Sequence, residues 1–194
     1  MTLTSRFEGA LLYASVLHAS QRRKGTNIPY FAHLISVAAI ALEHGANEDE
    51  AIAALLHDSV EDAGGKNRLE DILGRYGSTV AEIVSGCTDS DATPKPPWRA
   101  RKEAYIAHLK NASPSIRLVS AADKLHNSRS ILMDYRTHGE SVWTRFRGGG
   151  ERDGTLWYYR ALVDAFREFG STPLLEELDR TVTELEKLAR HSSA

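Results

Sequence analysis

Helical periodicity is the feature that most constrains the fold of this 194-residue chain. Apolar residues recur three and four positions apart in almost every segment, and no stretch shows the alternation of a half-buried strand. The expected helices cover residues 5–21, 30–44, 48–60, 69–76, 79–87, 99–111, 114–135, 155–169 and 173–190. The pattern predicts an all-α bundle of about eight to ten helices.

Several helix ends carry signals of their own. Gly45 stands where a left-handed residue follows a C-cap, and Asn47 with Glu50 has the spacing of a capping box. Ser113 followed by Pro114 is typical of an N-cap and the first helical position. These residues predict the boundaries of their helices.

Two stretches are expected to be loops. Residues 90–98, SDATPKPPW, hold three prolines, which interrupt helices. Residues 145–154, RFRGGGERDG, combine glycine with alternating charge and predict a mobile surface loop. The last residues, 191–194, are expected to fray.

The composition is that of a globular protein with a single domain over residues 1–194. A formal net charge of −2 argues against nucleic acid or an anionic membrane as a partner. The one cysteine, Cys87, excludes an internal disulfide framework, and the apolar run at residues 10–20 is too short to span a bilayer. A cytoplasmic location is therefore expected.

Four ionisable side chains follow an apolar run in LLHDSVED, residues 55–62. Helical neighbours lie three and four positions apart, so Asp58 would share a face with Leu55 and, one turn later, with Glu61 and Asp62. A face that belongs in the core therefore ends in carboxylates.

Asp123 stands on an equally apolar face, since Ile116 and Val119 precede it at helical spacing. Burying an unpaired carboxylate costs several kcal/mol, so a basic side chain or a metal ion is expected to lie next to Asp123. Asn127, one turn later, continues this face with a neutral polar group.

His33 lies on another mostly apolar helix, where a single histidine is more often a packing residue than a ligand. Together with His57, Asp58 and Asp123 it completes a set of two nitrogen and two oxygen donors. Such a set suits Mn²⁺, Fe²⁺ or Zn²⁺. The other histidines lack this company and are assigned to the surface or to packing; they are His18, His44, His108, His126, His138 and His191.

Three motifs resemble a known family. RRKGTNIPYFAH at residues 22–33, AALLHDSVED at 53–62 and AADKLHN at 121–127 resemble, in order and spacing, the hydrolase domain of the RelA/SpoT alarmone enzymes and their small stand-alone relatives. These belong to the HD-domain metal-dependent phosphohydrolases, and the likeness covers about residues 5 to 190. It implies an HD-domain helical bundle that hydrolyses the 3′-pyrophosphate of (p)ppGpp to GDP or GTP and pyrophosphate, usually with Mn²⁺. The chain ends where long relatives begin their synthetase domain, so it is expected to degrade the alarmone and not to make it.

Site residues follow from the resemblance by matching position. The implied metal ligands are His33, His57, Asp58 and Asp123, and the implied catalytic pair that polarises the attacking water is Glu61 and Asp62. The implied substrate contacts are Arg23, Lys24, Lys95, Asn127 and Arg145, with Arg147 as a further candidate for the far phosphates and Tyr30 beside the pocket. This chain departs from the family in carrying one residue more than many long relatives between Lys24 and His33, and in Leu34, where proline is common.

The sequence also allows other functions. The same chemistry could act on (p)ppApp or on the 2′-phosphate of NADPH, because one sequence does not separate guanine from adenine. A nucleotide sensor that binds without turnover is a second alternative, although it would have no need of Glu61 and Asp62. The expected partner is a small-molecule nucleotide, and whether the protein acts as a homodimer is left open.

Overall fold

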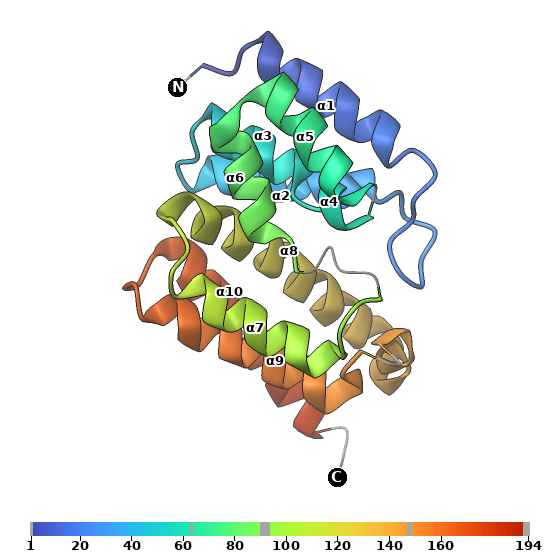
Figure 1. Cartoon of the computed structure of the whole chain (residues 1–194). Coiled ribbons are helices and arrows are strands. Elements are labelled where there is room, and N and C mark those ends of the chain that lie inside the picture. Colours follow the sequence, from blue (N-terminus) through green and yellow to red (C-terminus); the bar gives the residue numbers. More distant parts are fainter. Residues whose placement is uncertain (1, 63, 90–93, 147–148, 192–194) are drawn as a thin grey trace. The chain divides into compact units, whose positions relative to one another are not determined.

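The computed structural model describes residues 2–62, 64–89, 94–146 and 149–191. Within these ranges the chain is helical (Figure 1). The only extended pairing among the described residues is an isolated bridge between Arg22 and Pro29. The elements are α1 (Ser5–Leu17), α2 (Phe31–Glu43), α3 (Glu48–Leu56), α4 (Ser59–Asp62), α5 (Gly65–Tyr76), α6 (Ser78–Cys87), α7 (Trp98–Leu109), α8 (Pro114–His138), the 3₁₀ helix η1 (Gly139–Phe146), α9 (Glu151–Arg167) and α10 (Pro173–His191). The all-α prediction is confirmed.

The chain folds into two compact units. Unit 1 comprises Met1–Lys95 and Ala112–Asp123, and unit 2 comprises Pro96–Asn111 and Lys124–Ala194. The chain thus passes between the units more than once, and α8 contributes residues to both. The expectation of a single domain over residues 1–194 stays a prediction.

Helix α3 is central to unit 1. It packs against α1, α2 and α6, and its residues 51–56 are all fully buried. The predicted capping box starts this helix: the Asn47 side chain accepts from the Glu50 backbone, and the Glu50 side chain accepts from the Asn47 backbone. Three of its nine residues are alanines, whose small side chains let neighbouring helices approach closely. The polar end of α3 is therefore held in a tightly packed frame.

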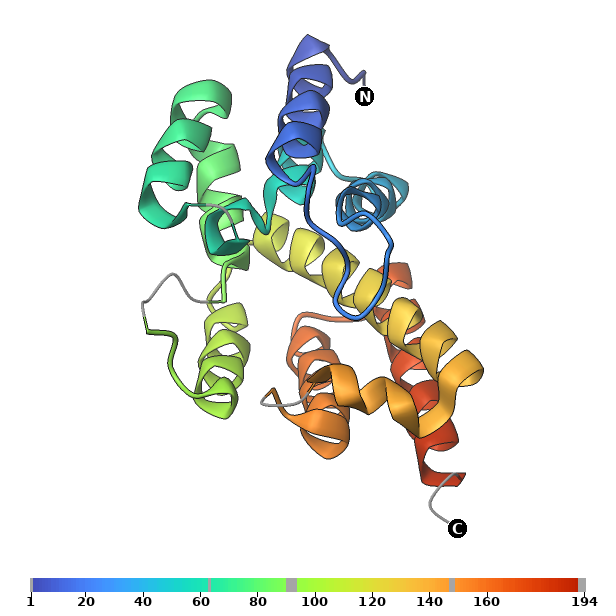
Figure 2. The ribbon, with the colours of Figure 1, turned by 90° about the vertical axis from the view of Figure 1, so that its right-hand side faces the viewer.

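Helix α9 has the corresponding place in unit 2, where it packs against α7, α10 and η1 (Figure 2). Arg160 on α9 bonds to Asp179 and Glu186 on α10, at 2.6 Å and 2.8 Å. None of the described helices combines the length and the apolar character that crossing a lipid bilayer requires.

Two of the expected helices have different boundaries in the structure. The first helix ends at Leu17 and not near residue 21, because His18 caps it and the Tyr30 N–H donates to the Gln21 carbonyl oxygen at 2.9 Å. The third helix breaks after Leu56, and α4 starts at Ser59. In a continuous helix His57 and Asp58 would diverge by about 100°, whereas the turn between α3 and α4 brings both side chains to one place.

The expected loop over residues 145–154 is also wrong for its described part. Arg145 and Phe146 end η1, and α9 begins at Glu151, with the left-handed Gly150 as its N-cap. Glu151 and Asp153 lie in the first turn of α9, where acidic side chains favour a helix N-terminus. The remaining loop residues 147–148, like residues 90–93 of the other expected loop and 192–194 of the expected tail, lie outside the described residues.

Candidate metal centre

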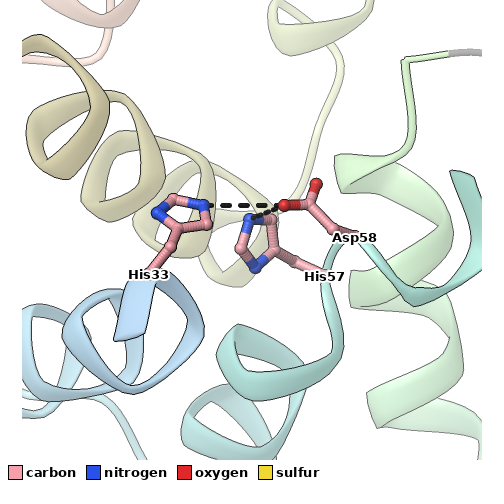
Figure 3. A group of neighbouring side chains, drawn as sticks. All are labelled: His33, His57 and Asp58. Atoms are coloured by element: carbon pink, nitrogen blue, oxygen red, sulfur yellow. Dashed lines mark ion pairs between the residues drawn. The ribbon is translucent and has the colours of Figure 1, made fainter. Parts of the chain in front are cut away.

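Two histidines and an aspartate converge in unit 1. His33 comes from the first turns of α2, His57 ends α3, and Asp58 follows it (Figure 3). Each offers one ligand atom, and these atoms lie within 4.8 Å of one another. Asp58 Oδ2 lies 3.0 Å from His57 Nε2 and 3.5 Å from His33 Nε2.

Asp123 of α8 joins this group. Its Oδ1 atom lies 3.2 Å from His33 Nε2 and 3.6 Å from His57 Nε2, and the residue is only 6% exposed. Two ligands that each bind a metal at about 2.1 Å, and that are about 90–110° apart around it, lie about 3.0–3.4 Å from each other. Two of the four distances, 3.0 Å and 3.2 Å, lie in this range, and the other two, 3.5 Å and 3.6 Å, are slightly longer. The arrangement is thus close to the spacing of donors around a single small cation.

The hydrogen bond of the other His57 ring nitrogen strengthens this fit. Nδ1 lies 2.8 Å from the carbonyl oxygen of Ala54, which can only accept, so Nδ1 carries a proton. In the neutral ring the lone pair is then on Nε2, which faces Asp58 and Asp123. A lone pair facing two carboxylates is repelled unless a second proton or a cation lies between them.

The local electrostatics point the same way. Burial lowers the pKa of His57, but the negative charges of Asp58 and Asp123 outweigh burial and raise this pKa well above its ordinary value. Burial raises the pKa of Asp58, and the two histidines outweigh it and hold this pKa well below its usual range. The site thus attracts positive charge and keeps Asp58 ionised, as the binding of a divalent cation requires.

Tyr30 supports the centre from the side. Its hydroxyl donates to Asp58 Oδ2 at 2.5 Å, and its ring meets His33 edge-on with the centroids 5.4 Å apart. Burial, followed by the charge of Asp58, raises the pKa of the Tyr30 phenol, so the hydroxyl stays protonated and remains a donor. The sequence placed Tyr30 beside the pocket; the structure adds its bond to a candidate ligand.

The acidic pair ends α4, next to the centre. Glu61 Oε1 accepts from Lys95 Nζ at 2.7 Å, so these two predicted site residues are brought together. Asp62 Oδ2 accepts from Gln21 Nε2 at 2.8 Å. The Asp62 side chain remains accessible, yet partial burial raises its pKa, and the charges of Asp58 and Glu61 add to this rise.

His18 and Gln21 were missed by the sequence reasoning. His18 was assigned to the surface or to packing, and its 1% exposure agrees with packing. Its Nδ1 also lies 2.6 Å from Gln21 Oε1, a contact that was not expected. Their separation of three positions was the one local signal. Nothing in the sequence linked them to Asp62, which lies 41 positions after Gln21.

The predicted substrate residues fall in both units. Arg23 and Lys24 belong to unit 1, in the turn between α1 and α2, where the Arg23 N–H donates to the Ile28 carbonyl oxygen at 2.9 Å. Asn127 and Arg145 belong to unit 2, and there Arg145 pairs with Asp134. Arg147 lies outside the described residues.

Comparisons with known proteins identify the family. The HD-domain family matches residues 10–155. A guanosine-3′,5′-bis(diphosphate) 3′-pyrophosphohydrolase of Danio rerio is 38% identical over 61% of this chain, and the match spans 65% of that protein. A protein of the same name from Drosophila melanogaster is 32% identical over 84% of this chain and 86% of its own length.

A solved structure gives the same result for the fold. The structure of a metazoan orthologue of SpoT, described as hydrolysing ppGpp, superposes with a TM-score of 0.74 at 29% sequence identity. The match covers 99% of this chain and 98% of that one. The HD domain implies a divalent metal, which agrees with the donor set found in unit 1. The chain therefore belongs to the HD-domain phosphohydrolases and, among these, to the small hydrolases of the RelA/SpoT type.

Proposed function

We propose that the protein hydrolyses the 3′-pyrophosphate of (p)ppGpp to GDP or GTP and pyrophosphate, with Mn²⁺ as its metal. The observation that carries the proposal is the convergence of His33, His57, Asp58 and Asp123, in which His57 Nδ1 is committed to a backbone carbonyl and Nε2 faces the carboxylates. The names of the relatives supply the substrate class. Fe²⁺ and Zn²⁺ suit the same donors.

The four residues would hold the cation, each through one side-chain atom. A divalent cation bound there would neutralise phosphate charge and lower the pKa of water. The buried imidazoles and Asp123 exclude bulk solvent from one side of the centre, while Asp58 lies nearer the accessible side.

Glu61 and Asp62 would act on the attacking water. Each is a carboxylate on α4, three and four residues after Asp58, and could orient the water or accept its proton. The oxygen of the water joins phosphorus, the bond between phosphorus and the ribose 3′ oxygen breaks, and the 3′ oxygen leaves as a hydroxyl once it has taken a proton. Such a reaction needs mainly positioning and charge stabilisation from the protein.

Basic and polar side chains would bind the nucleotide. Arg23 can stack on the base and Lys24 can meet a phosphate, with Lys95 also in unit 1. Lys95 already contacts Glu61, so a phosphate at Lys95 would lie close to the acidic pair. Asn127 and Arg145 are the proposed contacts from unit 2.

We also propose that residues 1–194 act as one hydrolase domain in the cytoplasm. The family match extends from residue 10 to residue 155 and so includes parts of both units. The sequence holds one cysteine, Cys87, and so has no internal disulfide framework, which is the common case in a reducing compartment.

Purified protein with Mn²⁺ should be tested in parallel against ppGpp, ppApp and NADPH, with pyrophosphate and free phosphate followed separately. Pyrophosphate released from ppGpp alone would support the proposal. A preference for ppApp, or phosphate released from NADPH, would move the substrate and keep the metal chemistry. Bound metal without release from any of them would overturn the enzymatic proposal in favour of a nucleotide sensor.

A further inference from the structure

Gln21 connects the end of α1 to the acidic pair. Its Nε2 donates to Asp62 Oδ2 at 2.8 Å, and a carboxylate oxygen can only accept. The amide nitrogen must therefore face Asp62, which turns Oε1 the other way, where His18 Nδ1 lies 2.6 Å from it. Because Oε1 also only accepts, His18 must carry its proton on Nδ1 and donate it to Gln21.

His18 is itself held in place. It is 1% exposed, and its ring lies against Tyr30 with the centroids 5.5 Å apart and the planes inclined by 30°. Its Nε2 lies 3.5 Å from the hydroxyl of Ser59, which is fully buried. With the proton on Nδ1, the lone pair on Nε2 faces a hydroxyl that can donate. Both ring nitrogens are thus engaged, and the ring has little freedom to turn.

The contacts of His18 and Gln21 form a series that starts and ends on α4. Ser59 begins the helix and Asp62 ends it. A helix of four residues is too short to be stable by itself, because nucleating a helix costs more than one turn returns. The direction of the Asp62 carboxylate must therefore come from contacts with the rest of unit 1. Gln21 occupies Oδ2, and no hydrogen bond between described residues occupies Oδ1.

The backbone of Gln21 is anchored as well. Its carbonyl oxygen accepts from the Tyr30 N–H at 2.9 Å, and the Tyr30 hydroxyl donates to Asp58. One segment thus reaches both a candidate metal ligand and a candidate catalytic carboxylate. The Gln21 hydrogen bond also opposes the rise that partial burial produces in the pKa of Asp62.

We infer that Gln21, oriented by His18, is a positioning residue that directs the free oxygen of Asp62 toward the attacking water. The inference rests on the proposed function, since a protein that only binds a nucleotide does not need this carboxylate directed. Gln21 would touch neither substrate nor metal and would act through Asp62 alone.

The kinetic test compares Gln21→Met, which keeps the length of the side chain and removes its hydrogen bonds, with Ser20→Ala at the exposed neighbouring position. For ppGpp hydrolysis with Mn²⁺, Gln21→Met should lower kcat about 10–100-fold and leave KM, bound metal and melting temperature unchanged. Ser20→Ala should match the wild type. A kcat for Gln21→Met equal to that of the wild type would overturn the inference.

Two variants of His18 separate positioning from packing. In His18→Asn the amide N–H can take the place of Nδ1–H, whereas His18→Leu fills space without a donor. The asparagine variant should therefore retain more kcat than the leucine variant, at the same content of bound metal. Equal losses in the two would assign His18 to packing and remove it from the inference.

A measurement without turnover makes the test independent of the substrate. The wild-type protein and Gln21→Met are both loaded with diamagnetic Zn²⁺. In the wild type, ¹⁵N NMR should show His18 as the Nδ1–H tautomer. In Gln21→Met, ¹³C NMR should show a higher pKa for the Asp62 carboxyl than in the wild type. The Nε2–H tautomer, or an unchanged Asp62 titration, would overturn the connection. A wild-type protein inactive toward ppGpp would overturn the proposed function, while the NMR result would still decide whether His18 and Gln21 orient Asp62.

Discussion

The two halves of LLHDSVED are held in opposite ways. His57 and Asp58 follow residues 51–56 of α3, which are fully buried, and meet His33 and Asp123 from two other helices. Glu61 and Asp62 stand on a four-residue helix and are held by single contacts from the long side chains of Lys95 and Gln21. The metal donors are thus positioned by packing of the core, and the acidic pair by side chains that can be changed without disturbing that core.

Replacing His57 with alanine should break the first half and have the largest effect. The His57 ring supplies a donor atom and fills buried space, so metal binding should fall to a small fraction of one ion per chain. Turnover should drop by about a thousandfold or more, since the cation would contribute several kcal/mol of charge stabilisation in the transition state. Metal analysis of the purified variant checks this, and stoichiometric metal in His57→Ala would remove His57 from the ligand set.

Glu61→Gln should break the second half and leave the first intact. The amide keeps the size of the side chain but can no longer accept a proton, so turnover should fall about 10²–10⁴-fold. Bound metal should stay at the wild-type level, because Glu61 contacts Lys95 and not the donor cluster. Metal content and kcat should be measured on the same preparation. Undiminished hydrolysis would exclude Glu61 from the mechanism.

Tyr30→Phe tests how Asp58 is held at the edge of the donor cluster. The change removes the hydroxyl that donates to Asp58 Oδ2 and keeps the ring that packs on His18 and His33. Loss of such a supporting bond should weaken metal affinity about 10–100-fold. Competition with a chelator measures this, with Tyr76→Phe as a control tyrosine away from the donor atoms. Equal affinity in Tyr30→Phe and the wild type would show that packing alone orients Asp58.

Lys95→Met should have the smallest effect on stability. The ion pair with Glu61 is partly exposed to solvent, with 45% of the Lys95 side chain accessible. Such pairs contribute about 0–1 kcal/mol, so the free energy of unfolding should change by less than about 1 kcal/mol. The variant should instead raise KM for ppGpp if Lys95 binds a phosphate. Chemical denaturation and steady-state kinetics together test the two statements, and an unchanged KM would argue against phosphate binding.

The sequence was most informative where local chemistry decides the structure. The capping box of Asn47 and Glu50, the N-cap Ser113 and the C-terminal glycine Gly45 all have the predicted roles. These features depend on residues a few positions apart, which the sequence shows directly. The break after Leu56 was not predicted, because the apolar run continues into His57 without a glycine or proline to mark a turn.

At Gly150 the error is the opposite one: a loop was predicted where a helix begins. Glycine and alternating charge at residues 145–154 predicted a loop, yet α9 begins at Glu151. A Cβ atom on Gly150 would lie 2.4 Å from the Trp98 ring, so this glycine allows close packing within unit 2. Trp98 lies 52 positions earlier in the chain, and that separation is why local reasoning missed the contact.

Periodicity in the sequence predicted the helical fold, and residue types on apolar faces predicted a donor set of His33, His57, Asp58 and Asp123, because both signals are local. The folded chain was needed to show that His57 Nε2 faces both carboxylates and that Gln21 connects His18 to Asp62. The reason is physical: the direction of a side chain depends on neighbours far away in the sequence, and periodicity carries no information about them.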